Sequence, residues 1–75
     1  MDRVIEIIKT TLDCKESLSE NSRFGDIASF DSMNSVNILL DLEAAYNADL
    51  SDMVITANMT IRELVDLLRE KGIEV

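Results

Sequence analysis

The sequence contains no histidine, and this absence removes several classes of catalytic site. Ser-His-Asp and Cys-His nucleophile arrangements need an imidazole, and so do the common zinc sites. The chain has 75 residues, which is enough for one small domain but not for a catalytic domain beside a substrate domain. We therefore do not expect an enzyme, and we expect residues 1–75 to form a single domain.

Proline is absent as well, and the chain has only two glycines and one cysteine. With so few turn-forming residues, the sequence indicates a largely helical protein. Cys14 has no partner for an internal disulfide, which is compatible with a reducing compartment. No signal peptide is visible, and every apolar run is far shorter than a membrane span, so we predict a cytoplasmic location.

Basic residues are few: seven stand against fifteen acids, which gives a formal charge of −8. This excess argues against binding to nucleic acid, which needs a basic face, and against docking on an anionic membrane. It favours protein partners with a basic patch. The alternative is that the charge only keeps a small domain soluble. Composition alone leaves both interpretations open.

Three segments show the spacing of amphipathic helices. Residues 2–13 place apolar side chains one helical turn apart, and residues 60–71 do the same. In the latter segment Thr60 and Glu63 match a capping box, and Gly72 follows as a stop signal. Residues 32–46 are apolar over more than half of the helix circumference. The pattern predicts three longer helices.

The two segments between the expected helices lead to different structural predictions. Residues 14–31 lack a sustained period and form a long loop, which we expect to be held to the core by its apolar side chains. These are Leu18, Phe24, Ile27 and Phe30. Residues 47–59 are predicted to contain a short third helix that starts at Asp52 or Thr56. The expected fold is an all-α, small four-helix bundle with three longer helices and one short helix.

The helix predicted over residues 32–46 has two apolar faces. One contains Ile38, Leu39, Leu42 and Tyr46 and is expected to be core. The other is the stripe Met33, Val36 and Leu40, which starts beside Ser32. From spacing alone such a stripe is more often core, and the alternative is an exposed surface for a partner.

Ser32 stands at the mouth of this helix, next to Asp31. Unpaired N–H groups and the positive end of the helix dipole make this position favourable for a phosphate. The simpler interpretation is that Ser32 is a plain N-cap, which serine often is. Asp31 also has two possible roles: it is the true N-cap of this helix, or it contacts another protein.

Three runs resemble acyl and peptidyl carrier proteins over nearly the whole chain: Phe30–Val36, Leu42–Tyr46 and Thr60–Leu64. The resemblance implies that a phosphopantetheinyl transferase, using Mg²⁺ at its own site, moves 4′-phosphopantetheine from coenzyme A to Ser32. The thiol of this arm would carry an acyl or aminoacyl group as a thioester. The chain itself would hold no metal and would be a non-catalytic monomer.

The same resemblance implies roles for neighbouring residues. Asp31 would contact the transferase or its metal, and Met33, Val36 and Leu40 would meet partner proteins. Asp41 and Glu43 would offer charges to basic partners, although isolated helix acids are more often merely solvated. The implied partners are the transferase, a loading enzyme, and a downstream synthase, transferase or thioesterase.

The chain also departs from the family pattern. Asn34 and Asn37 stand where fatty-acid carriers usually have acids, and Phe30 precedes the Asp-Ser pair where glycine is common. Fewer acids would weaken docking to a basic enzyme surface. We therefore predict a stand-alone carrier of a specialised polyketide, nonribosomal peptide or lipid-type pathway. The alternatives are a housekeeping fatty-acid carrier and a non-covalent helical adaptor that binds through the second helix.

Overall fold

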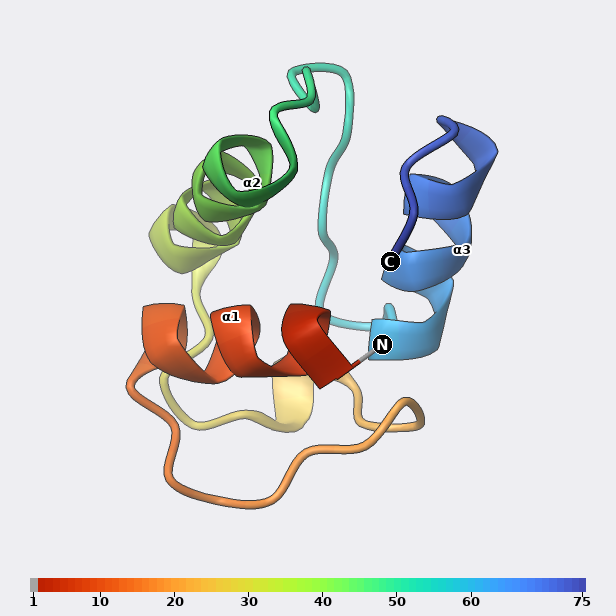
Figure 1. Ribbon diagram of the computed structural model, residues 1–75. Coiled ribbons are helices and arrows are strands. Elements are labelled where there is room, and N and C mark those ends of the chain that lie inside the picture. The colour runs from red at the N-terminus through yellow and green to blue at the C-terminus, as the bar shows by residue number, and fades with distance from the viewer. Residues whose placement is uncertain (1) are drawn as a thin grey trace.

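Helix α1 spans Asp2–Leu12, α2 spans Ser32–Tyr46 and α3 spans Ile61–Glu70 in the computed structural model, which describes residues 2–75. A 3₁₀ turn, η1, covers Phe24–Asp26 in the first connection. The described residues contain no strand beyond an isolated bridge between Arg23 and Thr60. Figure 1 shows the three helices around a common interior, with the long first loop passing beneath α1. The predicted all-α fold with three longer helices is confirmed.

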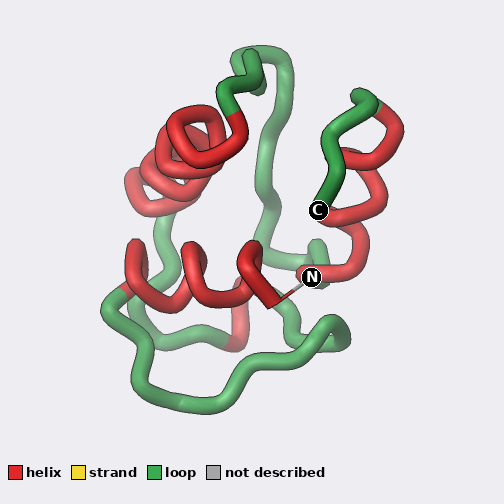
Figure 2. The backbone as a smooth tube through the Cα atoms, in the orientation of Figure 1, coloured by secondary structure: helices red, strands yellow, loops and turns green. Residues whose placement is uncertain are grey.

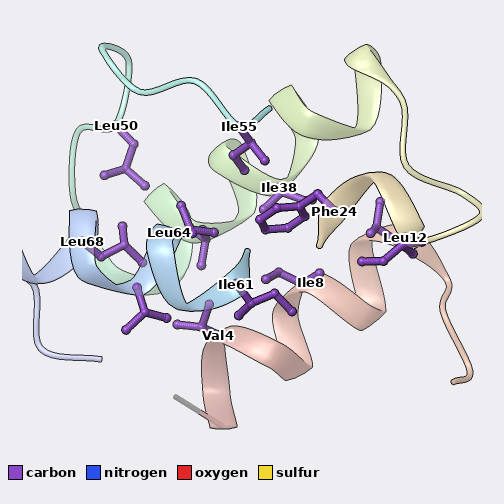
Figure 3. Packing of buried hydrophobic residues seen from close by; sticks show 13 residues of the cluster. Val4, Ile8, Leu12, Phe24, Ile38, Leu50, Ile55, Ile61, Leu64 and Leu68 are labelled. Carbon is purple, nitrogen blue, oxygen red and sulfur yellow. The ribbon is translucent and has the colours of Figure 1, made fainter. Parts of the chain in front are cut away.

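The core lies where the three helices face one another, and their apolar side chains fill it (Figure 3). Ile38 and Leu42 of α2 are fully buried, while Leu39 and Tyr46 are half-buried against them. The core face predicted for this helix is therefore confirmed. The fully or almost fully buried side chains are Val4, Ile8, Leu12, Phe24, Ile27, Ile38, Leu42, Leu50, Ile55, Ile61, Leu64, Val65 and Leu68.

The first loop is long but bonded to the rest of the fold, as Figure 2 lets the reader follow. Phe24 and Ile27 are buried, and Leu18 and Phe30 pack against the core, as predicted. The loop carbonyls of Ser22 and Glu20 accept the first N–H groups of α3, from Ile61 at 3.0 Å and from Arg62 at 2.8 Å. The next N–H of α3 is satisfied by the capping box of Thr60 and Glu63. The loop thus completes the N-terminus of α3.

The prediction of a short helix within residues 47–59 is wrong. This segment makes only two turns, closed by Met53 N–H to the Leu50 carbonyl and by Met59 N–H to the Thr56 carbonyl. Between these turns residues 53–56 form no helix, and Val54 is 70% exposed while Ile55 is buried. Val54, Ile55 and Thr56 are all β-branched, which lowers helix propensity. Alternating burial of neighbours suits an extended chain better than a helical turn.

Candidate functional site

Asp31 caps helix α2. Its backbone is extended, its Oδ1 accepts the N–H of Asn34 at 2.7 Å, and its carbonyl accepts the N–H of Ser35 at 3.0 Å. Ser32 is therefore the first residue inside the helix and not the cap. The interpretation of Ser32 as a plain N-cap is wrong, and Asp31 takes that role because its carboxylate reaches the third helical N–H.

The side chain of Ser32 is exposed, and its hydroxyl has no hydrogen-bond partner among the described residues. The backbone N–H groups of Ser32 and Met33 lie in the first turn, where helix geometry offers them no acceptor. They add to the positive end of the α2 dipole, which favours a phosphate. The geometry thus suits a phosphodiester on Ser32 Oγ, because a modification there breaks no bond of the fold.

The backbone before Ser32 is fixed by two side chains. Ser29 Oγ donates to the carbonyl of Leu12 at 2.6 Å, which joins this segment to the end of α1. Asn34 Nδ2 donates to the carbonyl of Ser29 at 2.7 Å, which joins it to α2. Sequence reasoning missed both contacts and read Asn34 only as a missing acid. The contacts place Ser32 on a well-anchored helix start.

The stripe that begins beside Ser32 faces solvent. Met33 is 73% exposed, Val36 55% and Leu40 54%. Spacings of three and four residues align them along one side of α2. The core interpretation of this stripe is wrong, and an exposed apolar surface remains. A fourth exposed apolar side chain, Val54, lies on the segment between α2 and α3, and no pattern in the sequence indicated it.

Asp41 and Glu43 lie on different sides of this stripe, and both make contacts within the chain. Thr11 Oγ1 of α1 donates to Asp41 Oδ2 at 2.5 Å. Glu43 Oε2 accepts the N–H of Leu50 at 2.7 Å and so holds the segment after α2. A role for either acid toward a basic partner stays a prediction, since each already serves the fold.

The sequence around Ser32 contains no histidine, which is the usual base for activating a serine. A serine hydroxyl is a weak nucleophile that needs a neighbouring base or a metal. The chain has no histidine, and the adjacent carboxylate of Asp31 is engaged in capping. Within residues 2–75, no three histidine, cysteine or acidic side chains gather in a way that could hold a metal ion.

A family model described as phosphopantetheine attachment site matches residues 2–68. The chain belongs to this family. Its domains bear 4′-phosphopantetheine as a covalent group, they are generally non-catalytic, and they act with modifying and biosynthetic enzymes. The curated proteins and the solved structures that were compared with the chain yield no match. This protein is thus a phosphopantetheine carrier with the helical fold expected of one.

None of the carrier's helices within residues 2–75 combines the length and the apolar character that crossing a bilayer requires.

Proposed function

We propose that Ser32 is the residue to which phosphopantetheine is attached, and that residues 1–75 act as one carrier domain. The observation that carries this proposal is the exposed Ser32 hydroxyl at the first position of α2, with the capping role filled by Asp31. The hydroxyl is free to react, and the helix does not depend on it.

The chemistry divides between the carrier and its transferase. Ser32 supplies the oxygen that receives the phosphopantetheinyl group from coenzyme A, and the start of α2 favours the resulting phosphodiester. We expect the transferase to take the serine proton, because the chain contains no histidine and Asp31 caps α2 through its Oδ1. The carrier is therefore a substrate of the transferase, which also brings the Mg²⁺. Asp31 is close enough in sequence to meet that enzyme, in addition to its capping role.

The loaded arm would carry an acyl or aminoacyl group as a thioester between enzymes. We assign the carrier to a specialised biosynthetic pathway, because α2 has no acid in its first turn. Met33, Val36 and Leu40 form the surface for its partners, with Asp41 and Glu43 at the edges of that surface. Those partners are a loading enzyme and a downstream synthase, transferase or thioesterase.

Incubation with a broad-specificity phosphopantetheinyl transferase, coenzyme A and Mg²⁺ tests this proposal directly. Intact mass should rise by one phosphopantetheinyl group in the unaltered chain and should not change in Ser32→Ala. Ser35→Ala is the matched control, since this serine lies in the same turn and only donates to the Ser32 carbonyl. Loading that survives Ser32→Ala would contradict the assignment.

A non-covalent adaptor is the second candidate, and the exposed stripe on α2 is the observation that favours it. The carrier and adaptor functions predict different effects of substitutions in cells. An adaptor would keep its function in Ser32→Ala and lose it in Leu40→Asp, whereas a carrier loses function in Ser32→Ala although the variant is folded.

A further inference from the structure

The stretch of chain directly before Ser32 has few main-chain hydrogen bonds of its own. Of the three described residues before Ser32, only Phe30 donates its N–H to a main-chain carbonyl, that of Ile27 at 3.0 Å. Ser29, Asp31 and Ser32 are exposed, and the backbone of Asp31 is extended. An exposed segment with so few backbone bonds belongs to the part of a fold that opens most easily. Side chains therefore have to hold this segment if Ser32 is to keep one position.

Asn34 holds the segment with both of its nitrogen atoms. Its main-chain N–H donates to Asp31 Oδ1 at 2.7 Å, and its side-chain Nδ2 donates to the Ser29 carbonyl at 2.7 Å. We call these two bonds the Asn34 clamp. Asn37 Nδ2 donates to Asn34 Oδ1 at 3.3 Å, which agrees with the amide nitrogen of Asn34 facing Ser29. An aspartate of the same shape could not replace Asn34, because an ionised carboxylate only accepts hydrogen bonds.

Two further contacts tie the clamped segment to the rest of the fold. Ser29 Oγ donates to the carbonyl of Leu12, at the end of α1, at 2.6 Å. The ring of Phe30 packs against that of the fully buried Phe24, with 5.5 Å between the ring centroids. Ser29 is therefore held by α1 through its hydroxyl and by α2 through its carbonyl. The unmodified carrier thus presents Ser32 from an ordered segment.

The order of this segment bears on the reaction at Ser32. A partner that binds a mobile segment has to immobilise it, and the entropic cost weakens binding. This cost is the same in the bound ground state and in the transition state, so it raises KM and leaves kcat unchanged. We propose that Asn34 is a positioning residue for the loading of Ser32 and that it acts through Ser29 and Asp31. This inference rests on the proposed function, because the reaction it concerns is the transfer of phosphopantetheine to Ser32.

Asn34→Ala tests the proposal, because it removes the side-chain donor to Ser29. Asn37→Ala is the matched control, since it removes the same side chain one turn later and leaves the Asn34 clamp in place. Loading of each full chain is measured with a broad-specificity phosphopantetheinyl transferase, coenzyme A and Mg²⁺. We expect Asn34→Ala to raise the KM for the carrier by about three- to tenfold, with kcat within about twofold of the unaltered chain. Asn37→Ala should change neither constant by more than about twofold.

A second measurement does not depend on the transferase. In the unmodified chain labelled with nitrogen-15, the backbone order parameters of Ser29 and Asp31 should lie near the value of about 0.85 that rigid backbone shows. In Asn34→Ala they should fall toward about 0.6, while those of Leu64 in α3 stay unchanged. Far-ultraviolet circular dichroism should show a folded chain, because Asn34 is not part of the buried core. If Asn34→Ala does not fold, Asn34→Asp removes the same donor with less change of shape and should give the same shifts in KM and order.

Equal KM values for Asn34→Ala and Asn37→Ala would overturn the inference while leaving the carrier function intact. A Ser29 backbone that stays rigid in Asn34→Ala would also overturn it, because the clamp would then not be what orders the segment. A fall in kcat at unchanged KM would do the same, since Asn34 would then act on the chemical step and not on binding. Failure of the unaltered chain to load at all would contradict the proposed function itself, and this inference with it.

Discussion

At the scale of single residues, Asp31 caps α2, and the Ser32 hydroxyl is left free for the attachment that we propose. A hydroxyl that caps α2 would lose its bonding geometry once a phosphodiester formed on it. Because Asp31 supplies the cap, Ser32 can be modified without loss of helix stability. The dipeptide Asp-Ser at the start of α2 therefore has a physical reason in this fold.

Gly25 is a second residue whose identity the fold requires. A Cβ at this position would lie 2.9 Å from both the Cβ and the carbonyl oxygen of Ala57, to which the Gly25 N–H donates. We expect Gly25→Ala to lower the free energy of unfolding by about 1–3 kcal/mol, because the first loop must move away from Ala57. Urea denaturation measures this change.

Ser17→Ala, in the same loop and on an exposed residue, is the control for Gly25→Ala and should leave the unfolding free energy nearly unchanged. Equal stability of Gly25→Ala and the unaltered chain would show that the contact with Ala57 does not constrain the loop.

At the scale of elements, the local sequence patterns correctly predicted the three helices, whose positions are determined by local interactions. The bounds of α2 were predicted at both ends, and those of α1 and α3 to within one residue. The spacing of apolar residues and the capping residues can be read directly from the sequence. Ser32 was singled out by the resemblance to carrier proteins together with its place at the start of α2, and its role as the attachment site stays a proposal.

The rest of the fold depends on contacts between distant segments, which no local pattern encodes. The N–H of Phe24 donates to the carbonyl of Met59, and this bond joins the 3₁₀ turn to the segment before α3. The helix predicted within residues 47–59 was wrong for the same reason. Ile55 is buried in the core between the three helices, and this contact between distant segments is not visible in the local sequence. The internal partners of Asp41 and Glu43 likewise come from other elements.

The segment between α2 and α3 is joined to α3 by a pair that responds to pH. The hydrogen bond from Lys71 lowers the pKa of Asp52 below its usual value of 3.8. A lowered pKa in the folded chain adds stability above the unfolded-state pKa, and that stability is lost as pH falls through the folded value. Below about pH 4, where a free aspartate protonates, the unaltered chain should lose more Tm than Asp52→Asn does.

Thermal melts of both proteins from about pH 5 to 3 check this expectation. Asp66→Asn, an exposed acid of α3, is the control and should follow the unaltered chain more closely. Parallel melting profiles for Asp52→Asn and the unaltered chain would mean that the Lys71 pair contributes nothing.

At the scale of the whole molecule, the excess of acids dominates. Only two ion pairs join bases to acids among the described residues, Arg62 with Glu20 at 3.8 Å and Lys71 with Asp52. Fifteen acidic side chains therefore stand against only seven basic ones. They lie close together, because the Cα radius of gyration of the fold is 11.0 Å. Their mutual repulsion destabilises the folded chain.

Added salt should therefore stabilise the carrier. We expect the Tm to rise by a few degrees, on the order of 3–8 °C, between low and physiological ionic strength, because screening weakens this repulsion. Glu6→Gln together with Glu16→Gln removes two exposed acids and should make the rise smaller. A Tm that stays flat or falls with salt would contradict the argument.

The most direct test of the central claim is to locate the modification on protein purified from its native host. Tandem mass spectrometry of the peptide that spans the start of α2 should find a phosphopantetheinyl group on Ser32. The same group on a different residue, or a native protein that never bears it, would contradict the account.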